Sequence, residues 1–391
     1  MKKVKTISVI ILLAVMTGCG RSQQLTDDFI IVDVTKSYPE KELILQDFLD
    51  VEYIPLDDAD EFVTHGIVMS IGKEIIVVTN IPINNGIFFV FDRQTGKGLR
   101  KINRKGQGAE EYINPTKIIL DEDNDEIFIL DNSIRKIQVY DLYGNFKRSL
   151  RFSEDIRTYD VLNYDSDHLI YYDVNYIWNV LDGTNFHPSY HIISKQNGSI
   201  TPKIQFPFEK LITPVTVSGN LPYLPRTWYP MVPYQGNWIL METSSDTVYQ
   251  YFPNKNTINP IIVRTPSIHS MDPEVFLFVS FLTDSYYFVE TVKKEYDRAT
   301  QTGFPSTDLM YDKRANMIFQ YIVYNDDNAD KIPVNLKSKP LNHEIAFWHK
   351  LEAYQLVEAY EKGQLKGRLK EIAADLDEES NPVIMIAKHR K

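Results

Sequence analysis

Short runs of apolar residues, separated by polar and turn-forming residues, recur along most of the chain. Each run is rich in Ile, Val, Phe and Tyr, spans roughly four to eight residues, and is bounded by Asp, Asn, Gly or Pro, which is typical of β-strands. The pattern therefore predicts an all-β protein. The clearest runs are 29–34, 75–79, 87–91, 117–120, 127–130, 137–140, 167–172, 238–242, 247–252, 258–263, 286–292 and 318–324.

One later stretch follows the helical period instead. Over about 341–376 the apolar residues recur mostly every three or four positions, which predicts a C-terminal helical insertion. Gly363 and Gly367 weaken the middle of this stretch, so two helical pieces are expected. A shorter segment, 273–282, fits a helix and a buried strand equally well.

A strand-and-turn motif is repeated at a nearly fixed interval. The sequence IFFVFDRQTG at 87–96 is echoed by IQVYDLYG at 137–144, with 49 residues between the two aspartates, and by HIISKQNG at 191–198. Each copy reads as a strand, a polar residue that starts a tight turn, and a glycine at the position of positive φ. Repeats of about 40–50 residues with four strands each are typical of propeller blades. We therefore expect a six-bladed β-propeller.

The first residues read as a targeting segment. Three lysines in positions 2–5 precede an apolar run at 7–16, which is too short to span a bilayer because about 20 residues are needed. The run ends in the sequence MTGC at 16–19, which resembles the lipobox of bacterial lipoproteins and implies acylation of Cys19 after removal of residues 1–18. The alternative is an ordinary secretory signal with a chance cysteine. On the lipoprotein interpretation, 19–28 is a lipidated tether and 29–391 is the propeller.

The charge and the cysteine count exclude several classes of protein. The formal net charge of −11 argues against nucleic-acid binding, which requires a basic face. Cys19 is the only cysteine, so a disulfide scaffold and a multi-cysteine zinc site are excluded.

Several motifs carry a more specific resemblance. The segment DEIFILDNSIRKIQVYDLYG at 125–144 resembles an NHL-type blade. Together with VEYIPL at 51–56, GQGAEEY at 106–112, SDTVY at 245–249 and NPVIMIAK at 381–388, it makes the mature chain similar to the six-bladed β-propeller lipoproteins of Gram-negative gut bacteria. The resemblance implies a fold and a location in the cell envelope, and no defined activity.

The fold that this resemblance implies divides the chain into blades, the last of which joins the two ends of the chain. In that blade 380–388 pairs with an early strand from 29–56, while 341–376 lies outside the blades. The expected blades are 62–104, 112–153, 156–208, 226–265 and 284–325, followed by the closing blade.

Two loops are candidate binding surfaces. The loop 104–112 contains two glycines and the charged residues Arg104, Lys105 and Glu110, and its alternative role is a brace between blades. The loop 219–234 combines four prolines with aromatic residues suited to stacking on sugar rings or aromatic peptides, and its alternative role is packing on itself. The residues of the second loop expected to bind a ligand are Tyr223, Arg226, Trp228, Tyr229 and Tyr234.

Metal and catalytic signatures are weak. The acidic run DEDNDE at 121–126 lacks the pattern of an EF-hand and is interpreted as a solvated turn, like 326–330. No nucleophile elbow, phosphate-binding loop or His-Glu-x-x-His motif occurs. Metal-dependent lactonases and lyases also use six-bladed propellers with ligands in the central channel, and His168, Asp173, Asn175 and Asp246 are the guesses that this analogy offers. No metal and no cofactor is predicted.

Two functions of different class remain. The first is a lipoprotein anchored through Cys19 to the outer membrane, whose propeller binds a glycan, a peptide or an envelope protein. The second is a metal-dependent hydrolase or lyase with its site in the propeller channel.

Overall fold

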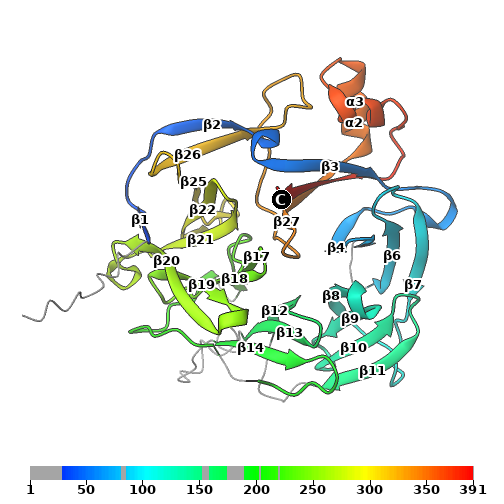
Figure 1. Cartoon of the computed structure of the whole chain (residues 1–391), viewed down its shortest axis with the longest axis horizontal. Coiled ribbons are helices and arrows are strands. Elements are labelled where there is room, and N and C mark those ends of the chain that lie inside the picture. Colours follow the sequence, from blue (N-terminus) through cyan, green and yellow to red (C-terminus); the bar gives the residue numbers. More distant parts are fainter. Residues whose placement is uncertain are drawn as a thin grey trace, which may run out of the picture.

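The computed structural model describes residues 29–80, 85–151, 158–173, 189–201, 204–218 and 221–390. Six sheets surround a central channel, so the chain forms the expected six-bladed β-propeller (Figure 1). None of the helices in these ranges combines the length and the apolar character needed to cross a bilayer.

Blades 1, 2 and 3 follow one another along the chain, each beginning with the strand nearest the channel. Blade 1 comprises β4 (Ile67–Ile71), β5 (Ile75–Thr79), β6 (Ile87–Asp92) and β7 (Gly98–Asn103). Blade 2 comprises β8 (Pro115–Asp121), β9 (Glu126–Asp131), β10 (Lys136–Asp141) and β11 (Phe146–Arg151). Blade 3 comprises β12 (Thr158–Asn163), β13 (His168–Asp173) and β14 (Ser189–Ser194).

The repeated turn has the expected geometry. Asp92 and Asp141 each accept hydrogen bonds from backbone N–H groups of the turn that follows them. Gly96 and Gly144 have φ of +73° and +83°, a region that favours glycine. These turns join the last two strands of blades 1 and 2.

Blades 4 and 5 each gain a fifth, outermost strand from the N-terminal part of the chain. These outer strands run parallel to β20 and β26, which they border. Blade 4 comprises β17 (Met231–Tyr234), β18 (Asn237–Met241), β19 (Thr247–Phe252), β20 (Thr257–Thr265) and β1 (Ile30–Asp33). Blade 5 comprises β21 (Val275–Leu282), β22 (Tyr286–Lys293), β25 (Ser306–Asp312), β26 (Met317–Tyr324) and β2 (Glu40–Ile44).

The ambiguous segment 273–282 is therefore mostly strand, and blade 5 begins at Val275 rather than at 284. Two hairpins lie outside the blades. They are formed by β15 (Thr216–Ser218) with β16 (Leu221–Tyr223), and by β23 (Tyr296–Asp297) with β24 (Thr302–Gly303).

Blade 6 closes the ring by pairing the two ends of the chain. It comprises β27 (Ile345–Leu351), β28 (Val383–His389) and β3 (Leu49–Pro55), with β28 antiparallel to both neighbours. The expected pairing of 380–388 with a strand from 29–56 is thus present. The helices α2 (Ala353–Glu361) and α3 (Gly367–Ala373) connect β27 to β28 and lie outside the ring (Figure 1).

The helical insertion is shorter than 341–376. Its first part contains β27, because Ile345, Ala346 and Phe347 are buried, and Ile345 and Phe347 pair with β28. Residues 335–344 lie on the channel side of this strand, where Ser338 Oγ accepts a hydrogen bond from the backbone N–H of Trp348 at 2.8 Å. We call residues 335–344 the channel segment.

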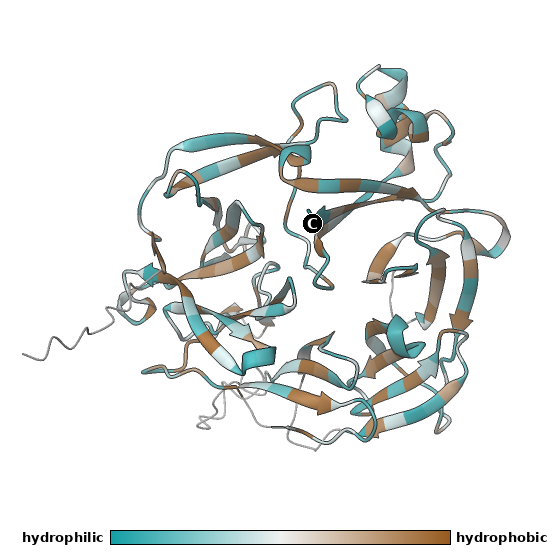
Figure 2. Ribbon diagram, viewed as in Figure 1, coloured by the Kyte–Doolittle hydropathy of each residue, from teal (hydrophilic) through white to brown (hydrophobic). Residues whose placement is uncertain are grey.

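The core consists of apolar layers between neighbouring blades. In β5, Ile75 and Val77 pack against blade 2, whereas Ile76 and Val78 pack against blade 6. Because successive residues of a strand face opposite sides, a strand between two blades is apolar on both faces. Figure 2 shows this concentration of hydrophobic residues in the strands.

Candidate ligand site in the central channel

The loop 104–112 is a brace between blades 1 and 2. The Arg104 Nε donates a hydrogen bond to the carbonyl oxygen of Gly144 at 2.7 Å. The Tyr112 hydroxyl is buried, donates to the carbonyl of Gly86 at 2.7 Å and accepts from the backbone N–H of Arg104. The carbonyl of Glu110 accepts from the Tyr140 hydroxyl at 2.6 Å. The hydrogen bond to Gly144 gives the Arg104 side chain a structural role between the two blades.

Lys105 and Glu110, the other charged residues predicted in this loop, have exposed side chains. They lie on the outside of the brace and neither lines the channel pocket described below.

The aromatic residues of the loop 219–234 are mostly interior. The Trp228 ring is fully buried and packs edge-on against Tyr172 with ring centroids 5.9 Å apart. Tyr234 is 7% exposed, and its hydroxyl donates to Asp284 at 3.2 Å. Trp228 and Tyr234 therefore present no stacking face at the surface, which corrects their interpretation as ligand platforms. The reason is that Tyr234 is the last residue of β17, and that Trp228 lies just before this strand in an apolar core shared with residues of blades 3 and 4.

The remaining residues of that loop divide between two roles. The Tyr229 hydroxyl donates to the carbonyl of Lys337 at 3.0 Å and so holds the channel segment. Arg226 is exposed, and Tyr223 stacks on Tyr296 with centroids 3.7 Å apart. Of the five predicted residues, Arg226 is exposed, and Tyr223 and Tyr229 are partly exposed.

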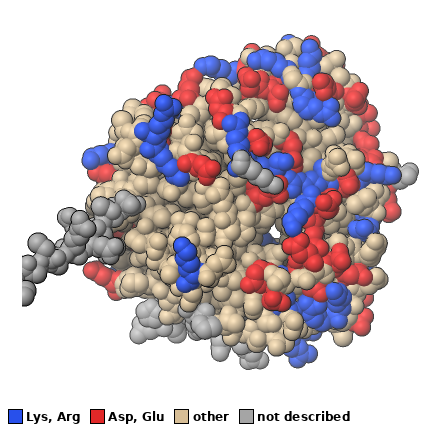
Figure 3. Space-filling model, viewed as in Figure 1, with Lys and Arg blue, Asp and Glu red and all other residues tan. Residues whose placement is uncertain are grey.

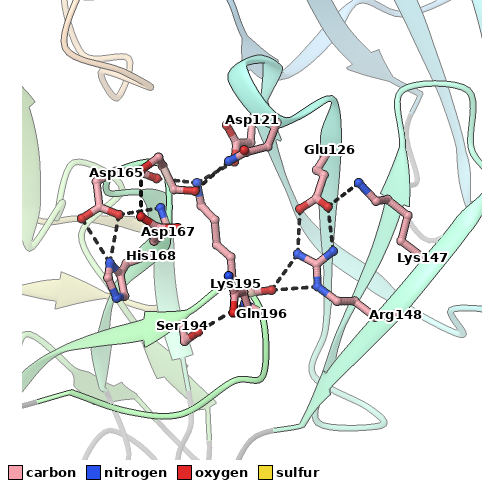
Figure 4. A network of polar contacts seen from close by, with 12 residues as sticks. Asp121, Glu126, Lys147, Arg148, Asp165, Asp167, His168, Ser194, Lys195 and Gln196 are labelled. Carbon is pink, nitrogen blue, oxygen red and sulfur yellow. Dashed lines mark hydrogen bonds and ion pairs between the residues drawn. The ribbon is translucent and has the colours of Figure 1, made fainter.

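The acidic run 121–126 is a solvated turn only in its middle, at 123–125. Its two ends, Asp121 and Glu126, are buried and join blades 2 and 3. Asp121 is 2% exposed and accepts from the Lys195 ammonium of blade 3 at 2.5 Å (Figure 4). Glu126 is also buried and binds both terminal nitrogens of Arg148, at 2.6 and 2.7 Å. Arg148 in turn donates to the carbonyl of Lys195, so one network ties blade 2 to blade 3.

The residues guessed from metal-dependent propellers are not brought together in the channel. His168 and Asp173 lie on β13, the second strand of blade 3, and Asp246 precedes β19. Asn175 and the lipidation candidate Cys19 lie outside the described residues. Across the described ranges, no three His, Cys, Asp or Glu side chains are grouped so that they could hold a metal ion.

A cavity of about 250 Å³ lies where the first strands of blades 1, 2 and 3 meet the channel segment. We call it the channel pocket. Its walls are mainly apolar, and charged side chains of both signs gather around the middle and the right of the molecular face in Figure 3. The residues that line it are Met69–Lys73, Lys117–Asp123, Val161–Asn163 and Leu341–Glu344.

Two lysines share one buried carboxylate beside the pocket. The Lys117 Nζ on β8 lies 2.9 Å from Asp160 Oδ1 on β12, and the Lys339 Nζ of the channel segment contacts Asp160 Oδ2. The side chains of Asp160 and Lys339 are 3% and 9% exposed, whereas that of Lys117 is 24% exposed. Burial lowers the pKa of Lys117 to about 8, and burial together with the neighbouring Lys117 lowers the pKa of Lys339 well below its usual value.

The acidic residues on the rim of the pocket already have partners. The Glu122 carboxylate accepts from the backbone N–H groups of Lys73, Glu74 and Ile75 at 2.5, 3.0 and 2.9 Å. Asp123 pairs with the Lys73 ammonium at 2.8 Å. A side chain on Gly72 would overlap Glu122, so glycine is needed for this approach.

Two further polar groups of the pocket lack partners among the described residues. They are Asn163 Oδ1 and His343 Nδ1, both buried atoms. Burial lowers the pKa of His343 to about 4, so the ring is neutral at pH 7. It packs edge-on against Trp238 with centroids 4.9 Å apart.

The comparisons with known proteins agree with this architecture. Residues 20–334 match the family described as 6-bladed beta-propeller, DUF5128, which is more than half of the chain. The chain belongs to this family. The match ends just before the channel segment, so Lys339, β27 and β28 lie beyond it. Among curated proteins, none matches the sequence.

The search of solved structures found a similar fold at low sequence identity. A presumed exported protein of Bacteroides fragilis superposes with a TM-score of 0.54 at 14% identity, over 93% of this chain and 100% of that one. A member of the duf4221 family from Bacteroides vulgatus gives a TM-score of 0.47 at 9% identity, over 87% and 96% of the two chains. The likeness to the Bacteroides fragilis protein concerns the fold alone.

Proposed function

We propose that this DUF5128 propeller is an envelope lipoprotein that binds a small ligand in its channel pocket. The observation that carries the proposal is the pocket itself, which joins apolar walls to a few polar groups supplied by three blades and the channel segment. Concave, largely apolar cavities with few polar groups are the usual form of small-molecule sites. The pocket replaces the loop 219–234 as the candidate binding region, because Trp228 and Tyr234 are buried.

A pocket-filling variant tests the binding part. Leu341 lines the pocket and is only half-buried, so Leu341→Trp fills the cavity from the channel segment at little cost to the core. A small-molecule library screened by thermal shift on the wild-type protein identifies compounds that raise its Tm. We expect these shifts to disappear in Leu341→Trp and to persist in Ile332→Trp, a control that adds the same ring at an exposed position. Shifts that survive Leu341→Trp would place binding elsewhere.

The anchor is tested separately. The lipobox-like sequence at 16–19 supports acylation of Cys19, and the similar fold of the Bacteroides fragilis protein described as exported is consistent with an envelope location. Metabolic labelling with palmitate in a Gram-negative host should label the full chain and should not label Cys19→Ala. The expected fractionation is with outer membranes for the wild type and with soluble material for the variant. Equal labelling of both would contradict the lipoprotein assignment.

A further inference from the structure

We infer that Lys117 is a reactive amine of the channel pocket, and that the pocket takes a small, uncharged aldehyde that Lys117 holds as an imine. This inference rests on the proposed ligand-binding function and names the class of ligand for the same pocket. It is carried by the sharing of one carboxylate between two lysines, by the position of one of these lysines in the pocket wall, and by the surfaces and charges around it.

A single buried carboxylate faces two lysines. Asp160 Oδ1 lies 2.9 Å from the Lys117 Nζ, and Asp160 Oδ2 contacts the Lys339 Nζ. The Asp160 side chain is 3% exposed, so one nearly inaccessible negative charge can compensate one ammonium group. A second ammonium group beside the first would be removed from water without compensation, which is costly. The cluster therefore favours a state in which one of the two lysines is a neutral amine.

Desolvation acts on both lysines in the same direction. Burial lowers the pKa of Lys117 from 10.5 to about 8, and burial together with Lys117 lowers the pKa of Lys339 well below its usual value. With a pKa of about 8, roughly a tenth of the Lys117 side chains are neutral at pH 7, against roughly one in three thousand for an ordinary lysine. Lysines desolvated in apolar pockets or placed next to another cationic group act as nucleophiles towards carbonyl compounds.

The geometry selects Lys117 as the lysine that meets a ligand. Lys117 lines the channel pocket, and its side chain is 24% exposed. The Lys339 side chain is 9% exposed, and Lys339 is not part of the pocket wall. Lys339 therefore acts through its neighbour, as the second lysine on Asp160, and Lys117 presents its amine to the cavity.

Imine formation at Lys117 balances without a further reactant. The amine nitrogen bonds to the carbonyl carbon of the aldehyde, and the electron pair of the C=O π bond moves to the oxygen. One proton passes from the nitrogen to that oxygen, for which Asp160 Oδ1, 2.9 Å from the nitrogen, can serve as the carrier. The hydroxyl then leaves as water with the second proton of the nitrogen, and the C=N bond closes. One amine and one aldehyde give one imine and one water.

The charges around the pocket favour a ligand without charge. Asp160 and Lys339 face the Lys117 amine directly, and the pocket wall itself holds more carboxylates than ammonium groups. An anionic carbonyl compound, such as a 2-oxo acid, is therefore repelled. His343 adds no charge at pH 7, because burial lowers its pKa to about 4. The wall carboxylates have partners: Asp121 pairs with Lys195, Glu122 accepts from backbone N–H groups, Asp123 pairs with Lys73, and Glu344 lies 3.6 Å from Arg93.

The walls and the volume of the pocket favour a small apolar group on the aldehyde. Met69, Leu162 and Leu341 contribute apolar side chains to the wall. The volume of about 250 Å³ is below the range of roughly 300–1,000 Å³ that drug-sized ligands occupy. A ligand of one ring therefore suits the cavity better than a larger molecule.

Reductive trapping on the wild-type protein tests the inference. Benzaldehyde is compared with 4-formylbenzoate, which has the same ring and a carboxylate. Sodium cyanoborohydride at pH 7 reduces each imine to a stable secondary amine, which peptide mapping by mass spectrometry locates. We expect benzaldehyde to modify Lys117 at least about tenfold faster than 4-formylbenzoate does.

Lys41 is the internal reference for the reactivity of Lys117. It lies on β2 of blade 5, its side chain is 33% exposed, and it pairs with the buried Asp312 at 2.5 Å. It thus resembles Lys117 in exposure and in having a carboxylate partner, and it lies outside the channel pocket. We expect benzaldehyde to modify Lys117 at least about tenfold faster than Lys41 at pH 7. This ratio should fall at least about tenfold by pH 10, because an ordinary lysine becomes a neutral amine only near its pKa of about 10.4.

Two variants connect the reaction to the pocket. Lys117→Arg keeps a positive partner for Asp160 and should abolish the adduct at position 117. Leu341→Trp should slow the modification of Lys117 at least about tenfold, whereas the exposed control Ile332→Trp should change it by less than about threefold. Circular dichroism checks that each variant is folded. The comparison of Lys117 with Lys41 needs no variant, so a variant that fails to fold does not decide the result.

The inference is overturned if Lys117 reacts no faster than Lys41, if their ratio does not change with pH, or if the two aldehydes modify Lys117 equally. Modification of Lys117 that is undiminished in Leu341→Trp also overturns it, because the reaction then proceeds outside the pocket. The proposed function fails on a different result, the thermal shifts of library compounds. If these shifts are lost in Leu341→Trp while Lys117 stays unmodified, the pocket is a ligand site and only the imine assignment is wrong.

Discussion

Asp160 controls the charge balance inside the channel. It is the carboxylate that faces both Lys117 and Lys339, and all three side chains come from different elements, β12, β8 and the channel segment. Removing its charge would leave two neighbouring lysine side chains without their carboxylate partner. A single atom exchange, oxygen to nitrogen, is therefore expected to have a large effect here.

The substitution Asp160→Asn should lower the free energy of unfolding by about 3–5 kcal/mol, the usual cost of breaking a buried ion pair from one side. The double variant Asp160→Asn with Lys339→Met should recover part of that loss, because one buried cation is removed with the anion. Urea denaturation at pH 7 measures both. A loss below about 1 kcal/mol in the single variant would show that the lysines do not depend on Asp160.

The two histidines beside the channel predict a specific acid sensitivity. Burial lowers the pKa of His343 and of His389 to about 4, below the usual value near 6.5. The unfolded chain therefore binds more protons than the folded one between pH 6.5 and 4. The stabilisation is fully present above pH 6.5 and is lost as the pH falls towards 4, by up to about 3 kcal/mol for each ring.

Thermal unfolding between pH 7 and pH 4 checks this dependence. His343→Asn and His389→Asn should each flatten the decline of Tm, since an amide does not titrate. His168→Asn is the control, because that ring is only partly buried at the rim of blade 3. If all three variants lose Tm as steeply as the wild type, the acid sensitivity has another origin.

At the scale of elements, the turn between β6 and β7 fixes how blade 1 meets blade 6. Gly96 has φ of +73°, and a side chain there would overlap the carbonyl oxygen of Pro55 at the end of β3. The backbone N–H of Asp57 also donates to the Gly96 carbonyl at 2.9 Å. Glycine is thus required at position 96 both by the positive φ of the turn and by the close approach of Pro55 in the neighbouring blade.

We expect Gly96→Ala to lower stability by about 3 kcal/mol or more, since it adds a backbone clash to the cost of positive φ. Gly236→Ala is the matched control. Its φ is +76°, and no atom lies within 4 Å of the position that the new methyl group would take. Its expected cost is only about 1–2 kcal/mol. Equal losses in the two variants, measured by urea denaturation, would remove the role of the contact with Pro55.

The elements themselves were largely predictable, for reasons that the exceptions make clear. The 49-residue spacing of Asp92 and Asp141 marks a turn whose chemistry is local, so the repeat and the blades follow from sequence. The segment 275–282 is apolar at nearly every position, and such a run has no period that separates a strand from a helix. The sequence pattern did not separate β27 from α2, because the strand ends at Leu351 and the helix begins at Ala353. The apolar residues of the strand therefore fit the helical spacing of the residues that follow.

The candidate site was not predictable in the same way. Lys117 and Asp160 are 43 positions apart, and Asp160 and Lys339 are 179 apart, so no motif unites them. A lysine within an otherwise apolar strand, as at Lys117, is the one local signal that was available. Conversely, the aromatic residues of 219–234 stand out in sequence because they are core residues of a long connection. Local composition could not separate burial from exposure.

At the scale of the whole molecule, Asn381 joins the two ends of the chain. It is 2% exposed and lies just before β28, and its amide nitrogen donates to the carbonyls of Asp57 and Phe62 at 2.8 and 2.9 Å. Its amide oxygen accepts from the backbone N–H of Thr64 at 2.8 Å. All three partners belong to the connection between β3 and β4, which links blade 6 to blade 1.

Asn381→Ala should therefore cost about 2–4 kcal/mol, because it leaves buried backbone groups without partners at the point where the ring closes. Asn237→Ala, which loses only a 3.3 Å contact to Gln235 in an exposed turn, should change stability by less than about 0.5 kcal/mol. Chemical denaturation followed by tryptophan fluorescence and by circular dichroism compares the two. If Asn381→Ala matches its control, closure does not depend on this amide.

The pairing of early strands with late ones also fixes the order in which the blades can be completed. Among the described strands β1, β2 and β3 come first along the chain, yet their partners are β20, β26 and β28, the last of which ends at His389. Such long-range pairing makes folding slow. During synthesis β1 can therefore pair only once β20 is made, β2 only once β26 is made, and β3 only once β28 is made. A chain that lacks β28 leaves both β27 and β3 without their partner, so blade 6 stays open. The ring can close only after β28 has been made.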